Sequence, residues 1–295
     1  LASSNFSSAA GAGAVSTTGG SGARWIIYTD APSGNAFDGL VSGNQAIWGQ
    51  SFASLPPGSV ASGNRYVFAT PGVITVTTTS PPAKPYGQTI SVANNVSYSG
   101  APLNSAASYG NVYQDMLLTD VLSTLPTVSS AGTPATASVA GSPYPVIAAG
   151  GVANAGFSIN YVNSGILVVD QTVLSITALA DSRTYNGQAY GGGNGVTYAG
   201  FLGSDNATTL DGNLVFAGTS QGAVNAGQYS IVPSGLTSNN YSIRYFPATL
   251  TIKPKEVTVA GLMAESKEFD GNDTVTIRNW EIGRASCRER VSSPV

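Results

Sequence analysis

Large apolar side chains occupy every second position in several short runs of this chain. Two such runs are FSINY at residues 157–161 and YSIRY at residues 241–245. A period of two places the apolar side chains on one face of a strand and the polar ones on the other. Turn signals separate the runs, among them Asn186-Gly187 and Asp270-Gly271. The pattern therefore predicts a mainly β protein of many short strands.

One stretch departs from this alternation. Between residues 113 and 125, the apolar residues Met116, Leu117, Val121 and Leu122 fall near helical spacing. We expect a short packing helix there, and at most short helices in the chain as a whole.

Two segments of the chain align with each other. The first contains VITVT (73–77), KPYG (84–87), VSYSG (96–100) and FSINY, and the second contains VLSI (173–176), RTYNG (183–187), VTYAG (196–200) and YSIRY. The closing tyrosines lie 245 − 161 = 84 residues apart, whereas the opening tyrosines lie 185 − 86 = 99 apart. The first copy therefore carries an insertion of about fifteen residues, which we place within residues 103–130. A third copy starts with VTV at 257–259, reaches KEFDG at 267–271 and breaks off at Trp280.

This alignment predicts tandem small β-rich domains joined by short links. We expect six parts: residues 1–22, a Ser/Gly/Ala-rich linker or the end of a shaft; 23–72, a β-rich module; 73–170, a repeat with the insertion; 171–255, a second repeat; 256–280, a truncated third repeat; and 281–295, a tail. The tail begins EIGRASCRERV and holds the only cysteine, Cys287. It resembles a translated sequencing adapter, so we treat it as an artefact and leave it out of the fold.

Composition narrows the chemistry that the chain can perform. Only 9% of residues are charged, against about 25% in typical soluble domains. There is no histidine, so the commonest general base and transition-metal ligand is missing. The net charge is −3, with no basic cluster for nucleic acid, and no apolar run is long enough for a membrane helix. We predict no enzyme activity, no catalytic residue, no cofactor and no metal site.

Two loops carry clusters of oxygen-bearing side chains that could suit Ca²⁺. They are Asp205, Asn206 and Asp211 in one loop, and Asp270, Asn272 and Asp273 in the other. Neither spacing matches a defined calcium loop, so we interpret both as turns.

Several of these motifs resemble known bacterial surface modules. KPYG and RTYNG, with the closing NYSIRY (240–245) and LTI (250–252), resemble the MBG repeat of bacterial adhesins. KEFDG resembles the opening of the related YDG repeat, with Phe269 in place of the usual tyrosine. ARWIIY (23–28), GNQAIWG (43–49) and GNRYVFA (63–69) resemble the module that precedes such repeats in filamentous-haemagglutinin-like exoproteins. Together the resemblance covers about residues 23–280.

The resemblance implies β-grasp-like repeats in a large protein exported by two-partner secretion. We expect a non-enzymatic repeat segment of a secreted adhesin, which serves as stalk or presentation modules in cell adhesion at the bacterial surface, associated with the outer membrane. The expected partners are the outer-membrane secretion pore during export and host-cell or bacterial surface glycans or proteins, but not nucleic acid. Because the chain starts at Leu1 with no signal peptide, we expect it to be a fragment of a longer protein.

Two alternatives remain open. One is a carbohydrate-binding module whose platform would be the rings of Trp25, Tyr28, Trp48, Tyr66 and Phe68, since aromatic faces can stack on sugars. Aromatic rings at strand alternation also serve as core, so the sequence leaves these five candidates undecided. The other alternative is the shaft of a contact-dependent toxin.

Overall fold

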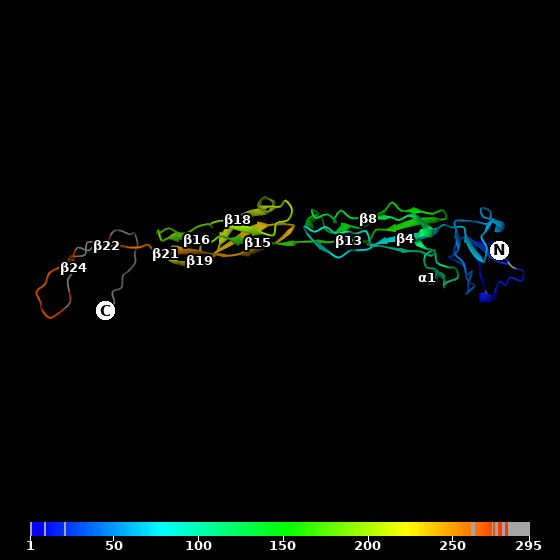
Figure 1. Cartoon of the computed structure of the whole chain (residues 1–295), viewed down its shortest axis with the longest axis horizontal. Coiled ribbons are helices and arrows are strands. Elements are labelled where there is room, and N and C mark those ends of the chain that lie inside the picture. The colour runs from blue at the N-terminus through cyan, green and yellow to red at the C-terminus, as the bar shows by residue number, and fades with distance from the viewer. Residues whose placement is uncertain are drawn as a thin grey trace. The chain divides into compact units, whose positions relative to one another are not determined.

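The computed structural model describes residues 2–8, 10–20, 22–260, 263–272, 274, 277–278 and 281–282. The chain forms two compact units, Leu1–Asp170 and Gln171–Val295 (Figure 1). Strands dominate both, and the α-helices in the described part of the chain are two segments of five and four residues. The predicted fold class, mainly β with at most short helices, is confirmed.

The first unit consists of small sheets. One three-stranded sheet is wholly parallel, in the order β1-β3-β2. Another places β4 between a parallel neighbour, β12, and an antiparallel neighbour, β6. The remaining pairs are β5 with β14, β7 with β11, β8 with β10 and β9 with β13. The strands are β1 (Ile26–Thr29), β2 (Ile47–Trp48), β3 (Arg65–Phe68), β4 (Gly72–Thr78), β5 (Lys84–Pro85), β6 (Val96–Ser99), β7 (Leu122–Thr124), β8 (Thr127–Ser129), β9 (Tyr144–Pro145), β10 (Ile147–Ala149), β11 (Val152–Ala153), β12 (Phe157–Val162), β13 (Ile166–Leu167) and β14 (Val169–Asp170).

The second unit has two larger sheets. Their strand orders are β17-β15-β20 and β16-β21-β19-β18. The strands are β15 (Thr172–Ala178), β16 (Asp181–Thr184), β17 (Val196–Ala199), β18 (Asp211–Ala217), β19 (Gly227–Thr237), β20 (Tyr241–Phe246) and β21 (Ala248–Lys253). Farther along lie two short antiparallel ladders, β22 (Val259–Ala260) with β25 (Glu281–Ile282) and β23 (Met263–Ala264) with β24 (Ile277–Arg278). They fall in the region of the expected third repeat and the first two residues of the expected tail; residues 283–295, with Cys287, lie outside the described part.

The strand pairing of the two units follows one scheme. In each, the first long strand has an antiparallel neighbour on one side and a parallel neighbour on the other. Equivalent rows bring similar residues together, a β-branched aliphatic residue between two tyrosines: Val76 with Tyr98 and Tyr161 in the first unit, and Ile176 with Tyr198 and Tyr245 in the second. The aligned sequence segments thus occupy equivalent places in the two sheets.

The predicted alternation is visible in the burial of the closing strands. In β12, the side chains of Phe157, Ile159 and Tyr161 are half-buried, whereas the intervening ones are exposed. β20 repeats this order, with Tyr241 fully buried.

The short helices follow the sequence prediction in part. α2 (Leu118–Val121), a single turn, lies within residues 113–125, where a short packing helix was expected, whereas α1 (Ser105–Tyr109) was not predicted. The apolar residues of that stretch lie in different environments. Leu117 is 69% exposed, whereas Leu122 is the first residue of β7, which pairs with β11. Both α-helices lie between β6 and β12, where the first unit has more residues than the second; the matching segment 200–240 contains a 3₁₀ turn, Ala207–Thr209, and no α-helix.

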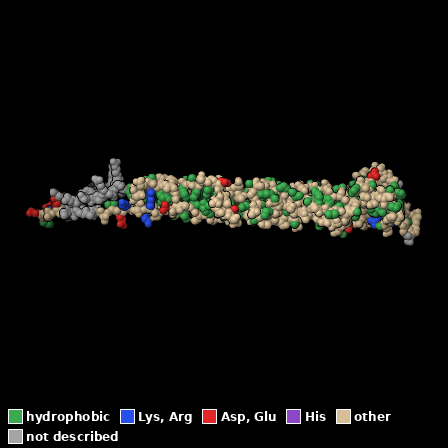
Figure 2. All heavy atoms as spheres, turned by 90° about the horizontal axis from the view of Figure 1, so that it is seen from above, with side chains coloured by type: hydrophobic (Ala, Val, Ile, Leu, Met, Phe, Trp, Pro, Cys, Tyr) green, Lys and Arg blue, Asp and Glu red, His purple; other side chains and the backbone are tan. Residues whose placement is uncertain are grey.

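The surface is poor in charge. In Figure 2 polar uncharged and apolar atoms cover most of the face shown, with few acidic or basic side chains. No helix among the described residues is long and apolar enough to span a bilayer.

Candidate functional site

The most extensive feature of the second unit is a pair of long extended segments. Residues 172–184 contain β15 and β16, and residues 241–253 contain β20 and β21. The two segments run parallel, since β15 pairs with β20 in six rows and β16 with β21 in four. We call residues 172–184 and 241–253 the terminal pair. The chain therefore enters this pair at one end of the repeat and leaves it at the other, and Figure 1 shows β15 and β21 toward opposite ends of the group of strands β15–β21.

The first unit contains a shorter version of the same arrangement. β4 pairs with β12 in six parallel rows, and β5 pairs with β14 in two. Backbone bonds extend this ladder on both sides, from Lys84 N to Val168 O at 3.0 Å and from Tyr86 N to Asp170 O at 2.8 Å. Only Gln171 separates β14 from β15 along the chain.

A buried lysine holds the KPYG turn of the first unit. Lys84 is 1% exposed, and its Nζ donates to Gln88 O at 2.6 Å and to Pro134 O at 2.7 Å. Burial lowers the pKa of this ammonium group, because removal from water disfavours its charged form. The lysine thus fastens the turn to a loop distant in sequence.

Arg183 does the same in the second unit. Its Nη2 donates to Gln188 O at 2.6 Å and to Ala223 O at 3.0 Å, and its guanidinium lies 5.3 Å from the ring centre of Tyr190. Tyr190 in turn donates its hydroxyl to Asp181 Oδ2 at 2.9 Å. KPYG and RTYNG were recognised in the sequence as repeated motifs, but the role of their basic residue was not predicted. A basic side chain at the same motif position in both copies, in a chain with 12 Lys and Arg, was the available signal.

The closing tyrosines are also fastened to backbone. Tyr161 Oη accepts from Gly151 N at 2.9 Å. Tyr245 Oη accepts from Leu236 N at 2.8 Å and donates to Leu236 O at 2.7 Å. These hydroxyls therefore serve packing and strand attachment.

The five aromatic candidates for sugar stacking lie in the interior. Trp25, Tyr28, Trp48, Tyr66 and Phe68 are at most 8% exposed. Four of them share one apolar cluster, in which the rings contact each other, and Tyr28 belongs to a neighbouring cluster. Because a stacking platform needs an open ring face, the proposed role of these five residues is wrong for this structure.

The same cluster changes the interpretation of the segments that flank the module. Phe6, from the expected linker, is 7% exposed and packs against Tyr66 with ring centres 6.5 Å apart. Val112 and Tyr113, from the insertion of the first repeat, complete the cluster. The linker residue and the insertion thus share one core with the module.

A pocket of about 310 Å³ opens between the module and the first repeat, inside the first unit. Its lining combines apolar groups, such as Met116 and Phe157, with the side chains of Gln45, Gln50 and Arg65. Arg65 Nη1 donates to Gln45 O at 2.7 Å. Burial, and then the nearby charge of Arg24, lower the pKa of Arg65; among the described residues no carboxylate forms an ion pair with it.

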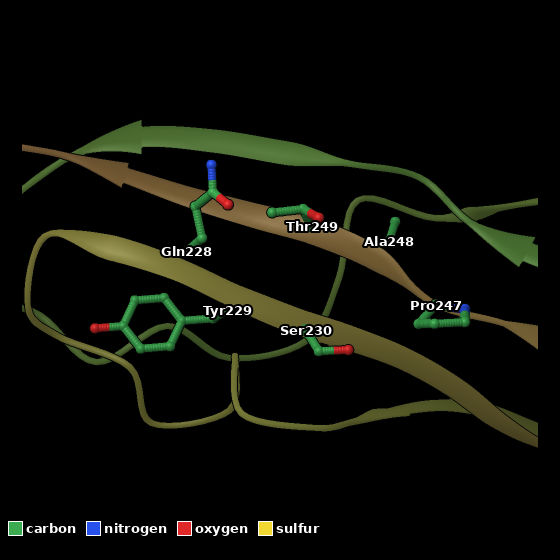
Figure 3. Close-up of a pocket in the computed structure, with 6 residues that line it drawn as sticks. All are labelled: Gln228, Tyr229, Ser230, Pro247, Ala248 and Thr249. Carbon is green, nitrogen blue, oxygen red and sulfur yellow. The ribbon is translucent and has the colours of Figure 1, made fainter.

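A shallower groove of about 230 Å³ lies on the second unit, over β19 and β21. Figure 3 shows Gln228 and Tyr229 projecting to opposite sides of β19, as strand alternation requires. The lining carries no charged group. Its polar atoms do not converge on one point, which a specific ligand site needs.

The two candidate calcium loops are tied into local bonds. Asp205 Oδ2 accepts from Tyr241 Oη at 2.7 Å, and Asn206 Oδ1 accepts from Thr208 N at 2.9 Å. Asp270 pairs with Lys267 at 2.9 Å, while Asp273 lies outside the described residues. In the described part of the chain, no three acidic, cysteine or histidine side chains gather as metal ligands.

Comparison with known proteins identifies one domain. Residues 174–251 match the MBG domain family (YGX type). The match starts within β15 and ends within β21, so the matched residues lie in the second unit and both ends of the match fall in the terminal pair. No curated protein and no solved structure matches the chain.

Proposed function

We propose that this chain is a non-enzymatic repeat segment of a large secreted bacterial surface adhesin, in which MBG-type repeats form a stalk that presents a binding region to other cells. MBG domains occur in adhesin-like surface proteins, and residues 174–251 match that family. The observation that carries the proposal is the shared pairing scheme: in each unit the first long strand of the repeat pairs in parallel with a later long strand, β4 with β12 and β15 with β20, and only Gln171 separates β14 from β15. Such units extend a chain by a fixed length each, which is what a stalk requires.

Surface display tests the stalk role. The full chain is inserted between an outer-membrane anchor and a tip domain of known ligand, in one, two or three copies. A flexible Gly/Ser linker of equal residue number is the matched control, because it behaves as a random coil. We expect ligand capture past a surface polymer layer to increase with copy number and to exceed that of the linker; no increase would contradict the proposal.

A second candidate, carbohydrate binding, is favoured by one observation, the pocket that holds Arg65. A glycan array with the full chain tests it, with Ala155→Trp to fill the pocket. Ala155 lines the pocket and is exposed; Ala180→Trp, at an exposed position of the second unit, is the control. Saturable binding that Ala155→Trp abolishes and Ala180→Trp retains would replace the stalk role by a binding role for the first unit.

A further inference from the structure

Resistance to tension is a further function that the strand pairing supports. We propose that the terminal pair of the second unit is a mechanical clamp, which resists a pull along the chain because the pull shears its two segments against each other. This inference deepens the stalk role and rests on it for its biological meaning. It concerns residues 172–184 and 241–253.

The direction of the strands sets how a pull is distributed. A pull on the chain draws Thr172 toward the amino-terminal side and Lys253 toward the carboxy-terminal side. Because the segments that hold these residues are parallel, the two forces act in opposite directions along two successive ladders, β15 with β20 and β16 with β21. All ten rows, six between β15 and β20 and four between β16 and β21, are then strained together. In an antiparallel terminal pair the same pull would open the rows one at a time.

Both ends of the ladder are fastened. At the amino-terminal end, Thr172 N donates to Asn240 O at 3.1 Å, and Gln171 Nε2 donates to Ser238 O at 3.3 Å. At the far end, Tyr185 N donates to Lys253 O at 2.8 Å. The pull therefore meets hydrogen bonds at the first and last residues of the pair.

Side-chain packing also opposes sliding of the two segments. Leu174, Ile176, Leu250 and Ile252, two from each segment, are at most 2% exposed. A slip by one residue, about 3.3 Å along a strand, would turn every side chain of the moving segment to the opposite face. The rows must accordingly break together over a short distance, which gives a high rupture force.

The clamp is tested by pulling one protein in two directions. In full-length chain with Cys287→Ser, Val173→Cys combined with Lys253→Cys anchors opposite ends of the pair and shears it. Val173→Cys combined with Ser242→Cys anchors one row, since Val173 pairs with Ser242, and peels the rows in turn. All three side chains are exposed, and both geometries release about 240 Å of chain, so the two events are comparable in single-molecule force spectroscopy.

We expect a severalfold higher unfolding force in the shear geometry than in the peel geometry. Equal forces, or a lower force in shear, would overturn the clamp. Should Val173→Cys fail to fold, Gln171→Cys with Lys255→Cys and Gln171→Cys with Asn239→Cys provide the same two directions from exposed positions. The ratio of unfolding forces is measured independently of the display assay. A higher force in shear without an effect of copy number on ligand capture would reject the stalk role alone. An effect of copy number with equal unfolding forces would reject the clamp alone.

Discussion

Three glycines of the second unit allow a graded test of how its strands are closed. Gly200 has φ +114°, and a Cβ there would lie 2.6 Å from Val173 O, on β15. Gly187 has φ +77°, but a Cβ there would have no atom within 4 Å. Gly191 has neither a positive φ nor an atom within 4 Å of a Cβ. An alanine at Gly187 costs only the left-handed conformation, about 1 kcal/mol. At Gly200 it adds a collision with backbone that cannot move without opening the ladder, so we expect about 3 kcal/mol in total. At Gly191 we expect no loss, or a gain of about 0.5 kcal/mol from a less flexible unfolded chain.

Urea unfolding of the full chain, followed by circular dichroism, measures these differences. Gly100 is the matched position in the first unit, with φ +141° and a Cβ that would also collide, with Val73 O. Gly100→Ala should therefore lower the transition of the first unit, while Gly200→Ala lowers that of the second. The reasoning is refuted if Gly200→Ala destabilises the protein no more than Gly187→Ala does.

Three further changes probe buried polar groups. Lys84→Met should destabilise the first unit by about 2 kcal/mol in urea unfolding, because it leaves two carbonyls without their donor; unchanged stability would show that these carbonyls find other partners. Tyr66→Phe removes a buried hydroxyl bond to Leu40 O at 2.6 Å and should cost about 1 kcal/mol, a loss that a thermal melt would reveal. Burial, and then the bond to Asp181, raise the pKa of Tyr190 to about 12, and burial also raises the pKa of Tyr66. A tyrosine whose pKa is higher in the folded than in the unfolded protein contributes its full stabilisation below the unfolded pKa, near 10. The free energy of unfolding should therefore fall as the pH rises from about 10 toward 12. A free energy of unfolding that stays constant over this pH range would contradict the expectation.

The sequence was sufficient where a local pattern determines the structure. Alternation in FSINY and YSIRY predicted strands, and burial in β12 and β20 follows it. Asn186-Gly187 and Asp270-Gly271 predicted turns, and Gly187 and Gly271 indeed have positive φ. These features depend on neighbouring residues, so a single sequence contains them.

The sequence was insufficient where the outcome depends on residues far apart. Trp48 is part of the core because its ring packs against Phe68 and Tyr113. Tyr113 lies 65 residues farther along the chain, yet its ring centre is 6.0 Å from that of Trp48. The short helix expected within residues 113–125 is present as α2, but it ends at Val121 because Leu122 pairs with Ala153 in a ladder. Helical spacing in the sequence does not reveal a strand partner that lies far along the chain.

Positions that match between the two copies and positions that differ bear on different functions. Two of the matching pairs, Lys84 with Arg183 and Gly100 with Gly200, act on backbone: the basic residues fasten turns and the glycines let strands approach. They support the framework that both stalk and clamp need, and neither Lys84 nor Gly100 lines the pocket of the first unit. Met116, which does line it, comes from the insertion that the second copy lacks. Specific recognition in this chain should therefore be sought at the insertion and its junction with the module, and mechanical properties in the rows that both copies share.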